Sequence, residues 1–169
     1  MITATSTTFK SIPKVWLRAG VIMAVMVIVP LFNFQFITGP LVNACLLLIV
    51  MLAGLNQARF AALIPSIIAL SVGLLPVALA PTIPYIMLAN IIFVTVFDKM
   101  RVKNYWYGVI AASLAKFAFL AASSYIVGQL MFGQAIAAKA TAMLSWPQLL
   151  TALGGGIIAY AILKALKRI

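Results

Sequence analysis

The apolar residues of this chain fall into long runs, not into the alternating or one-sided patterns of a soluble protein. Six such runs are separated by short segments that contain proline, glycine, asparagine and most of the charged residues. A helix needs about 20 mostly apolar residues to cross a bilayer. The pattern therefore predicts six transmembrane helices, over residues 15–32, 40–55, 61–79, 84–97, 105–132 and 146–163.

Two of the predicted spans, 40–55 and 84–97, are shorter than the others and open with Pro40 and Pro84. Proline is well tolerated in the first turn of a helix. A short span either thins the bilayer locally or begins below the membrane surface and leaves a hollow above it. The longest connection, 133–145, is either an amphipathic surface loop or a lid over the outer mouth of such a hollow.

The composition agrees with a membrane protein. Of the 169 residues, 66% are hydrophobic and 8% are charged, whereas a soluble domain is about half apolar and about a quarter charged. We therefore expect a single all-α integral membrane domain over residues 1–169, with no soluble catalytic domain. The chain has no histidine, and its one cysteine, Cys45, lies within an apolar run. We expect no disulfide, no metal site and no cofactor.

The charge is strongly asymmetric: 12 Lys and Arg stand against one acid, Asp98. Cations next to membrane spans favour the cytoplasmic side and meet anionic lipid, so binding of nucleic acid is disfavoured. If the N-terminus is cytoplasmic, the outer loops carry only Lys139. The ten inner cations are then Lys10, Lys14, Arg18, Arg59, Lys99, Arg101, Lys103, Lys164, Lys167 and Arg168. This split predicts that both termini are cytoplasmic.

Lys116 lies inside the fifth predicted span, ~16 Å along the helix from Tyr105 at 1.5 Å per residue. That depth is near the bilayer middle, where an ionisable residue is a candidate for a functional site. As such a site it offers a cation to a carboxylate or phosphate. The alternative is that Lys116 snorkels to the surface, or pairs with a carbonyl or with Asp98.

Asn43 and Asn90 each follow a proline within a predicted outward-to-inward span. Amides at that depth need a partner, either across a helix interface or in a ligand. We expect Lys116, Asn90 and Asn43 to converge below the outer surface. Ser123 and Tyr85 complete the predicted substrate-binding set. Ser123 lies about two turns outward of Lys116, and the Tyr85 ring either stacks on a ligand or contacts the core or lipid. Other polar residues that the same cavity could include are Asn33, Gln35, Thr38, Ser124, Gln129, Gln134, Gln148 and Thr151.

Small residues mark places where helices approach closely. The fifth and sixth spans have such faces, which are typical of internal packing. On the first span, Ala19, Gly20 and Ala24 form a patch that either packs internally or docks a partner protein.

The motifs of several enzyme classes are absent. The sequence has no phosphate-binding loop ending in Lys-Ser or Lys-Thr, no HExxH and no acidic pair. We therefore do not expect an enzyme or a chain that hydrolyses ATP by itself. Proton-coupled transport is also disfavoured, because Asp98 lies at the edge of the membrane.

Four segments carry a resemblance to a known family. They are Gly39-Pro40-Leu41-Val42-Asn43, Ile64-Pro65-Ser66, Ala69-Leu70-Ser71-Val72-Gly73-Leu74-Leu75-Pro76 and Ile83-Pro84-Tyr85-Ile86-Met87-Leu88-Ala89-Asn90. With the six predicted spans, they make the chain resemble the S-component, the substrate-binding membrane subunit, of an energy-coupling factor (ECF) transporter. The likeness covers nearly the whole chain.

The resemblance implies a protein of a bacterial or archaeal plasma membrane that binds a vitamin-like micronutrient in an outward-facing pocket. It also implies docking on a shared transmembrane subunit that carries two cytoplasmic ATPases. In the family, an Ala-x-x-x-Ala patch on the first helix makes that contact. Here the matching positions are Gly20 and Ala24, with Ala19 beside them, so the chain departs from the family pattern.

Two other functions are compatible with the same features. A membrane scaffold resembling the rod-shape protein MreD, which has a similar size and six-span fold, would have no small-molecule ligand and no need of Lys116. A stand-alone facilitator would transport without an ATPase partner.

Overall fold

The computed structural model describes residues 14–32, 34–131 and 134–169, with side chains except at 14–19, 32, 128–131, 134–137 and 139. Within these ranges the regular structure is entirely helical, as the sequence predicts. The helices are α1 (Lys14–Ile28), α2 (Gln35–Leu52), α3 (Leu55–Ala61), α4 (Ile64–Ser71), α5 (Ile83–Met100), α6 (Tyr105–Met131), α7 (Gln134–Leu144) and α8 (Trp146–Ala165). Two short 3₁₀ helices, η1 (Val29–Phe32) and η2 (Val77–Thr82), connect some of them.

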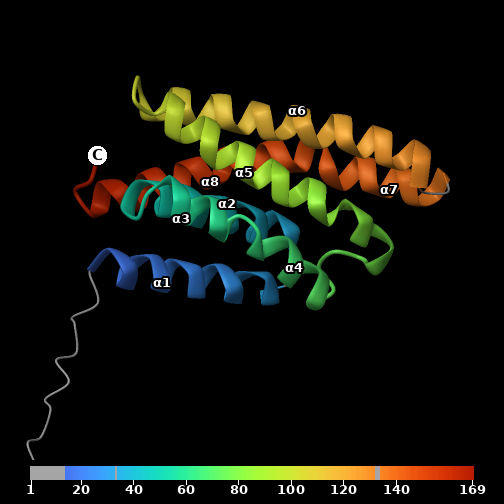
Figure 1. The fold of residues 1–169 in the computed structure, drawn as a ribbon, viewed down its shortest axis with the longest axis horizontal. Helices are drawn as coiled ribbons and strands as arrows, with labels where there is room; N and C mark the ends of the chain where they lie inside the picture. Colours follow the sequence, from blue (N-terminus) through green and yellow to red (C-terminus); the bar gives the residue numbers. More distant parts are fainter. Residues whose placement is uncertain (1–13, 33, 132–133) are drawn as a thin grey trace, which may run out of the picture.

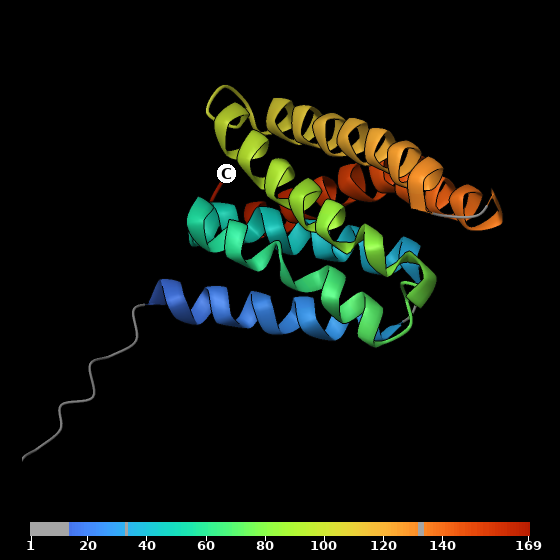
Figure 2. The same ribbon diagram turned by 45° about the vertical axis from the view of Figure 1, so that its right-hand side comes forward.

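The helices lie side by side along the long axis of the molecule (Figures 1 and 2). α2 is the central helix and packs against α1, α3, α5 and α8. α5 packs along α6, which in turn contacts α7 and α8. α1 lies at one edge of this bundle and α6 at the opposite edge.

Four helical segments of the described chain are long and apolar enough to cross a membrane. They are Gln35–Leu52, Val77–Met100, Tyr105–Val127 and Ala140–Ala165. By length and composition, these are the helices of a membrane protein. The other two predicted spans contain shorter helices: 15–32 contains most of α1 and all of η1, and 61–79 contains α4 and the start of η2.

The predicted span 61–79 is broken in the structure. α3 ends at Ala61, and α4 begins at Ile64 with Pro65 in its first turn. Proline has no N–H to donate to the preceding turn, and its ring clashes with that turn, so a helix cannot continue through this point undisturbed. α4 itself ends at Ser71, just before Gly73, whose φ is 78°. The predicted single helix 61–79 is therefore the short α4, which follows the last residue of α3 and precedes η2, a 3₁₀ helix that begins at Val77.

The predicted start of the second span is also wrong. α2 begins at Gln35, not at residue 40, and Pro40 lies inside it. Pro40 has no N–H to donate to the Phe36 carbonyl, so α2 continues through it with one intrahelical hydrogen bond fewer. α5 does carry Pro84 in its first turn, but it extends past residue 97 to Met100. Neither helix is as short as predicted.

The segment 133–145, predicted to be a long connection, is mostly helical. α7 spans Gln134–Leu144 and packs on α6. Its alanines and methionine are strong helix formers. Ser145 breaks the helix, and Pro147 lies in the first turn of α8, where its missing N–H costs nothing.

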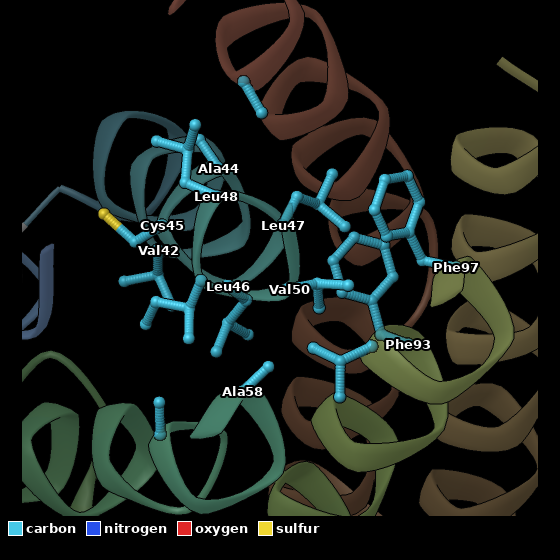
Figure 3. Close-up of a cluster of buried hydrophobic side chains, with 14 of the residues drawn as sticks. Val42, Ala44, Cys45, Leu46, Leu47, Leu48, Val50, Ala58, Phe93 and Phe97 are labelled. Carbon is cyan, nitrogen blue, oxygen red and sulfur yellow. The ribbon is translucent and has the colours of Figure 1, made fainter. Parts of the chain in front are cut away.

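The core surrounds α2. Residues 42–50 of this helix are buried without interruption, and a helix that is apolar and buried on all sides belongs at the centre of a bundle. Figure 3 shows the side chains of α2 pointing in several directions, with Phe93 and Phe97 of α5 beside Leu47 and Val50.

Glycines allow α8 to approach α2 and α6 closely. A Cβ at Gly155 would lie 2.6 Å from Asn43 Cβ and 2.8 Å from the Pro40 carbonyl oxygen, and one at Gly156 would collide with Val109. This small-residue face therefore serves internal packing.

One end of the bundle is basic. The C-terminal ends of α5 and α8, the start of α6 and the short α3 meet there, and the α5–α6 connection lies at the same end as the C-terminus (Figure 1). Its cations are Arg59, Lys99, Arg101, Lys103, Lys164, Lys167 and Arg168. Asp98 is also at this end, where it accepts two hydrogen bonds from Arg101, at 2.7 and 3.0 Å.

Candidate functional site: a polar cavity within the bundle

Lys116 of α6 points into the bundle, and its side chain is only 3% exposed. Its Nζ donates a hydrogen bond of 2.7 Å to Asn43 Oδ1 on α2. The same Nζ lies 5.3 Å from the centre of the Phe93 ring on α5, within the range of a cation–π interaction. Lys116 therefore neither snorkels to the surface nor pairs with Asp98, which binds Arg101 instead.

Asn90 of α5 is 3% exposed and bonds to the break between α3 and α4. Its Nδ2 donates to the carbonyl oxygen of Ala62 at 3.3 Å. Because a carbonyl only accepts, this bond fixes which end of the amide is the oxygen. Asn90 Oδ1 has no partner in the described part of the chain. One half of the amide is thus used in helix packing, and the other half remains available.

Lys116, Asn43 and Asn90 line one cavity of about 110 Å³. The structure therefore brings together the three residues that the sequence predicts to converge. Their role in binding a substrate remains a prediction. The cavity wall is otherwise largely apolar, with Val42, Leu75 and Ile86 among its residues.

Four further polar residues line the cavity. Gln35, Thr38 and Gln148 belong to the wider predicted set, whereas Ser66 is not among the predicted cavity residues. Ser66 is 3% exposed, and its Oγ is buried without a hydrogen-bond partner among the described residues. It lies on α4 directly after Pro65, so the proline break that shortens this helix is the signal that could have indicated it.

The side-chain amides of Gln35 and Gln148 connect α2 and α8 to the end of α7. Each donates its Nε2 to the carbonyl oxygen of Met143, at 3.4 and 3.3 Å. Met143 and Leu144, at the end of α7, also line the cavity. The segment predicted as a loop or a lid thus contributes a helix end to the cavity wall.

Other predicted residues lie elsewhere. The Oγ of Ser123 donates to the Phe119 carbonyl of its own helix at 2.7 Å, and neither Ser123 nor the half-buried Tyr85 lines the cavity. Ser124 and Thr151 also bond to carbonyls one turn earlier. Asn33 and the side chains of Gln129 and Gln134 lie outside the described residues.

The cavity occupies the half of the bundle away from the basic end. The residues that α2, α5 and α8 contribute to its lining come from the N-terminal halves of these helices, whose C-terminal ends meet at the basic end. Lys116 lies at its inner limit, in the twelfth position of α6 by the bounds of that helix. A ligand approaching from the end of the bundle farther from the basic residues would reach Lys116 near the middle of the helix bundle.

The chemistry of the cavity suits a small polar molecule. An ammonium group has three donors, and Lys116 uses one of them on Asn43. Asn90 Oδ1 can accept a hydrogen bond, and the Ser66 hydroxyl can both donate and accept one. A site for one water needs roughly 10–15 Å³ on this measure, so the cavity is large enough for several waters or for a small organic group.

The predicted docking patch lies on the surface of α1. Gly20 and Ala24 are exposed, and a Cβ at Gly20 would meet no atom within 4 Å. The side chain of Ala19 lies outside the described residues. This patch is therefore not used to pack α1 against the described bundle.

A second hollow, of about 400 Å³, lies between α1, α2 and α8. Its lining is apolar except for one cation, and consists of Val21, Ile22, Leu48, Leu52, Ile162, Leu166 and Arg168. It lacks the convergent amides of the Lys116 cavity and so offers little to orient a polar ligand.

No family model matches this chain, and no curated protein or solved structure matches it significantly. The likeness to S-components therefore remains a prediction from the sequence. The functional argument rests on the helices, the basic end and the Lys116 cavity.

Proposed function

We propose that the chain is the substrate-binding membrane subunit of an ECF-type uptake transporter, and that it captures a small micronutrient in the Lys116 cavity. The observation that carries this proposal is the convergence of three buried polar residues, Lys116, Asn43 and Asn90, on one cavity. An ionisable residue buried within a membrane bundle is costly, and such residues commonly mark a ligand or ion site.

The proposal includes six membrane crossings with both termini in the cytoplasm of a bacterial or archaeal cell. Four candidate spans support it directly. α1 and the α3–α4 pair would supply the other two, shielded by their neighbours in the bundle. The basic end supports the orientation, because Lys and Arg are enriched in cytoplasmic loops. In that orientation the cavity lies in the outer half of the membrane.

The partners of this proposal are a shared transmembrane subunit and two cytoplasmic ATPases. The chain has no phosphate-binding loop of its own, so ATP hydrolysis would have to come from other subunits. The exposed patch of Gly20 and Ala24 on α1 supports a docking surface, since small residues allow another helix to approach closely.

The experiment is affinity purification of the full tagged chain from mild-detergent extracts of its native host, with the copurified proteins identified by mass spectrometry. We expect a membrane subunit and two P-loop ATPases in stoichiometric amounts. A Gly20→Leu variant should fold normally and lose these partners, whereas Val27→Leu, at another exposed position of α1, should keep them. Recovery of the chain without any ATPase would contradict the proposal.

A scaffold resembling MreD is the second candidate. The observation in its favour is that Lys116 and Asn90 already bond to other helices and so tie the bundle together. In that case the purified chain should bring down proteins of cell-wall synthesis, and Lys116→Ala should leave its function intact.

A further inference from the structure

The amine of Lys116 faces the cavity in a chain that has a single acidic side chain. That residue, Asp98, is bound to Arg101 at the basic end. Asn43 Oδ1 accepts one N–H of Lys116 but carries no net charge. Burying an ammonium group is expensive unless an anion compensates it. Because the side chains of this sequence supply no such anion, an ammonium group at Lys116 is stable in this cavity only when a bound molecule supplies the compensating charge.

We propose that the molecule held in the Lys116 cavity carries one negative charge, as a single carboxylate does, and at least one hydrogen-bond donor. This inference rests on the function proposed above and names the chemical class of the substrate.

The cavity wall limits the ligand to one negative charge. Among the described lining residues, Lys116 is the one with a cationic side chain. A dianion, such as a dicarboxylate, would therefore bring a second charge into a largely apolar space with nothing to neutralise it. A cation would be repelled by Lys116 and would find no carboxylate.

The hydrogen-bond donor of the ligand is inferred from Asn90. Its Oδ1 is buried and has no partner within the described chain, while its Nδ2 is held by the Ala62 carbonyl. A buried acceptor left without a hydrogen bond is unfavourable. An O–H or N–H of the ligand would satisfy it, and the Ser66 hydroxyl could bond the same group or the carboxylate. The apolar side chains Val42, Leu75 and Ile86 would then contact an aliphatic or aromatic body.

The test compares four probes of similar size that differ in charge and in donors. Hydroxyisocaproate has one carboxylate and one hydroxyl; isocaproate lacks the hydroxyl; hydroxyisocaproamide is neutral; isobutylmalonate has two carboxylates. Each is titrated against the purified full chain in detergent, and the shift of the unfolding temperature is measured. Because a ligand that binds only the folded state stabilises it in proportion to the logarithm of its excess over Kd, the shifts rank the affinities.

We expect hydroxyisocaproate to give the largest shift, isocaproate a smaller one, and the amide and the malonate none. The inference would be overturned if the amide or the malonate gave a shift equal to or larger than that of hydroxyisocaproate. It would also be overturned if hydroxyisocaproate or isocaproate gave no shift.

Asn43→Asp provides the sharpest variant. It places a carboxylate where Oδ1 now lies 2.7 Å from Lys116 Nζ, so the chain itself compensates the charge. We expect this variant to fold at least as stably as the wild type, and to bind hydroxyisocaproate about tenfold or more weakly, as the loss of one charged hydrogen bond would imply. Lys116→Met should lose the same binding, and Asp98→Asn should retain it. Undiminished binding by Asn43→Asp would contradict the inference.

The two proposals fail in different ways. If a neutral or doubly charged probe binds and Lys116→Met abolishes its binding, the ligand class is wrong but the cavity is still a binding site. If no probe of any charge stabilises the wild type and no small molecule copurifies with it, the proposed function itself fails.

Discussion

Lys116 Nζ donates a hydrogen bond of 2.7 Å to Asn43 Oδ1 and so links α6 to α2 across 73 positions of the sequence. Neither residue is more than 3% exposed. This bond both ties two helices together and holds the amine at the inner limit of the cavity. Its structural and its binding roles can be separated by mutation.

The structural role of the bond is measured by a double-mutant cycle of Asn43→Leu and Lys116→Met. Leucine has the branching of asparagine and should fit beside Gly155, but it leaves the Lys116 amine without its acceptor. We expect Asn43→Leu alone to cost about 1–3 kcal/mol in the free energy of unfolding, and most of this cost to disappear in the double variant. Reversible unfolding in detergent micelles measures these values; strictly additive effects would show that the two residues are not coupled.

The close packing of α8 on α2 makes Gly155 intolerant of a larger residue. An alanine Cβ would lie 2.6 Å from Asn43 Cβ and 2.8 Å from a backbone oxygen of α2, so either the helices or Asn43 must shift. We expect Gly155→Ala to destabilise the fold by about 1–3 kcal/mol and to weaken ligand binding. Thermal unfolding in detergent measures the first effect.

Gly20→Ala is the matched control for this substitution, because the position is exposed and has no atom within 4 Å of the added carbon. We expect it to be neutral or to stabilise α1 by up to about 1 kcal/mol. Equal destabilisation by the two alanines would contradict the packing described for α8.

The topology can be tested with single cysteines, since Cys45 is the only native one and is buried. In a Cys45→Ala background, Asn56→Cys places an exposed thiol at the start of α3, and Val77→Cys places one at the start of η2, after α4. With six crossings, an impermeant thiol reagent added to intact cells should label residue 77 and not residue 56. Labelling of both residues would show that α3–α4 does not cross the membrane.

The ion pair between Asp98 and Arg101 should contribute little to stability. Their side chains are 26% and 33% exposed, respectively, and pairs with access to solvent are typically worth about 0–1 kcal/mol. We expect Asp98→Asn to change the free energy of unfolding by no more than that. A large loss of stability would show that Asp98 has a further partner.

Much of the fold could be predicted from the sequence because long apolar runs permit few structures other than membrane helices. α5, α6 and α8 begin within a residue of their predicted starts. The breaks could not be predicted in the same way. The run 61–79 has no charged residue, and the local geometry at Pro65 and Gly73 divides it. α7 was missed because its alanines form a helix without a long apolar run.

The convergence of Lys116, Asn43 and Asn90 could be predicted because each is a polar residue at a similar depth in an apolar helix. Depth alone, however, does not give the direction of a side chain. Ser123 lies on the same helix as Lys116, yet its hydroxyl bonds to its own backbone. Ser66 reaches the cavity through the break before α4, a tertiary feature that has no counterpart in the pattern of polar and apolar residues.

The central claim is that the Lys116 cavity holds a small molecule, and its most direct test is to measure what copurifies with the chain. The full chain is purified from its native host under mild conditions, denatured, and the released small molecules are quantified by mass spectrometry. We predict one species in near-stoichiometric amount in the wild type and in Asp98→Asn, and its loss in Lys116→Met. Equal amounts in the wild type and in a folded Lys116→Met variant, or no species in any of the three, would contradict the claim.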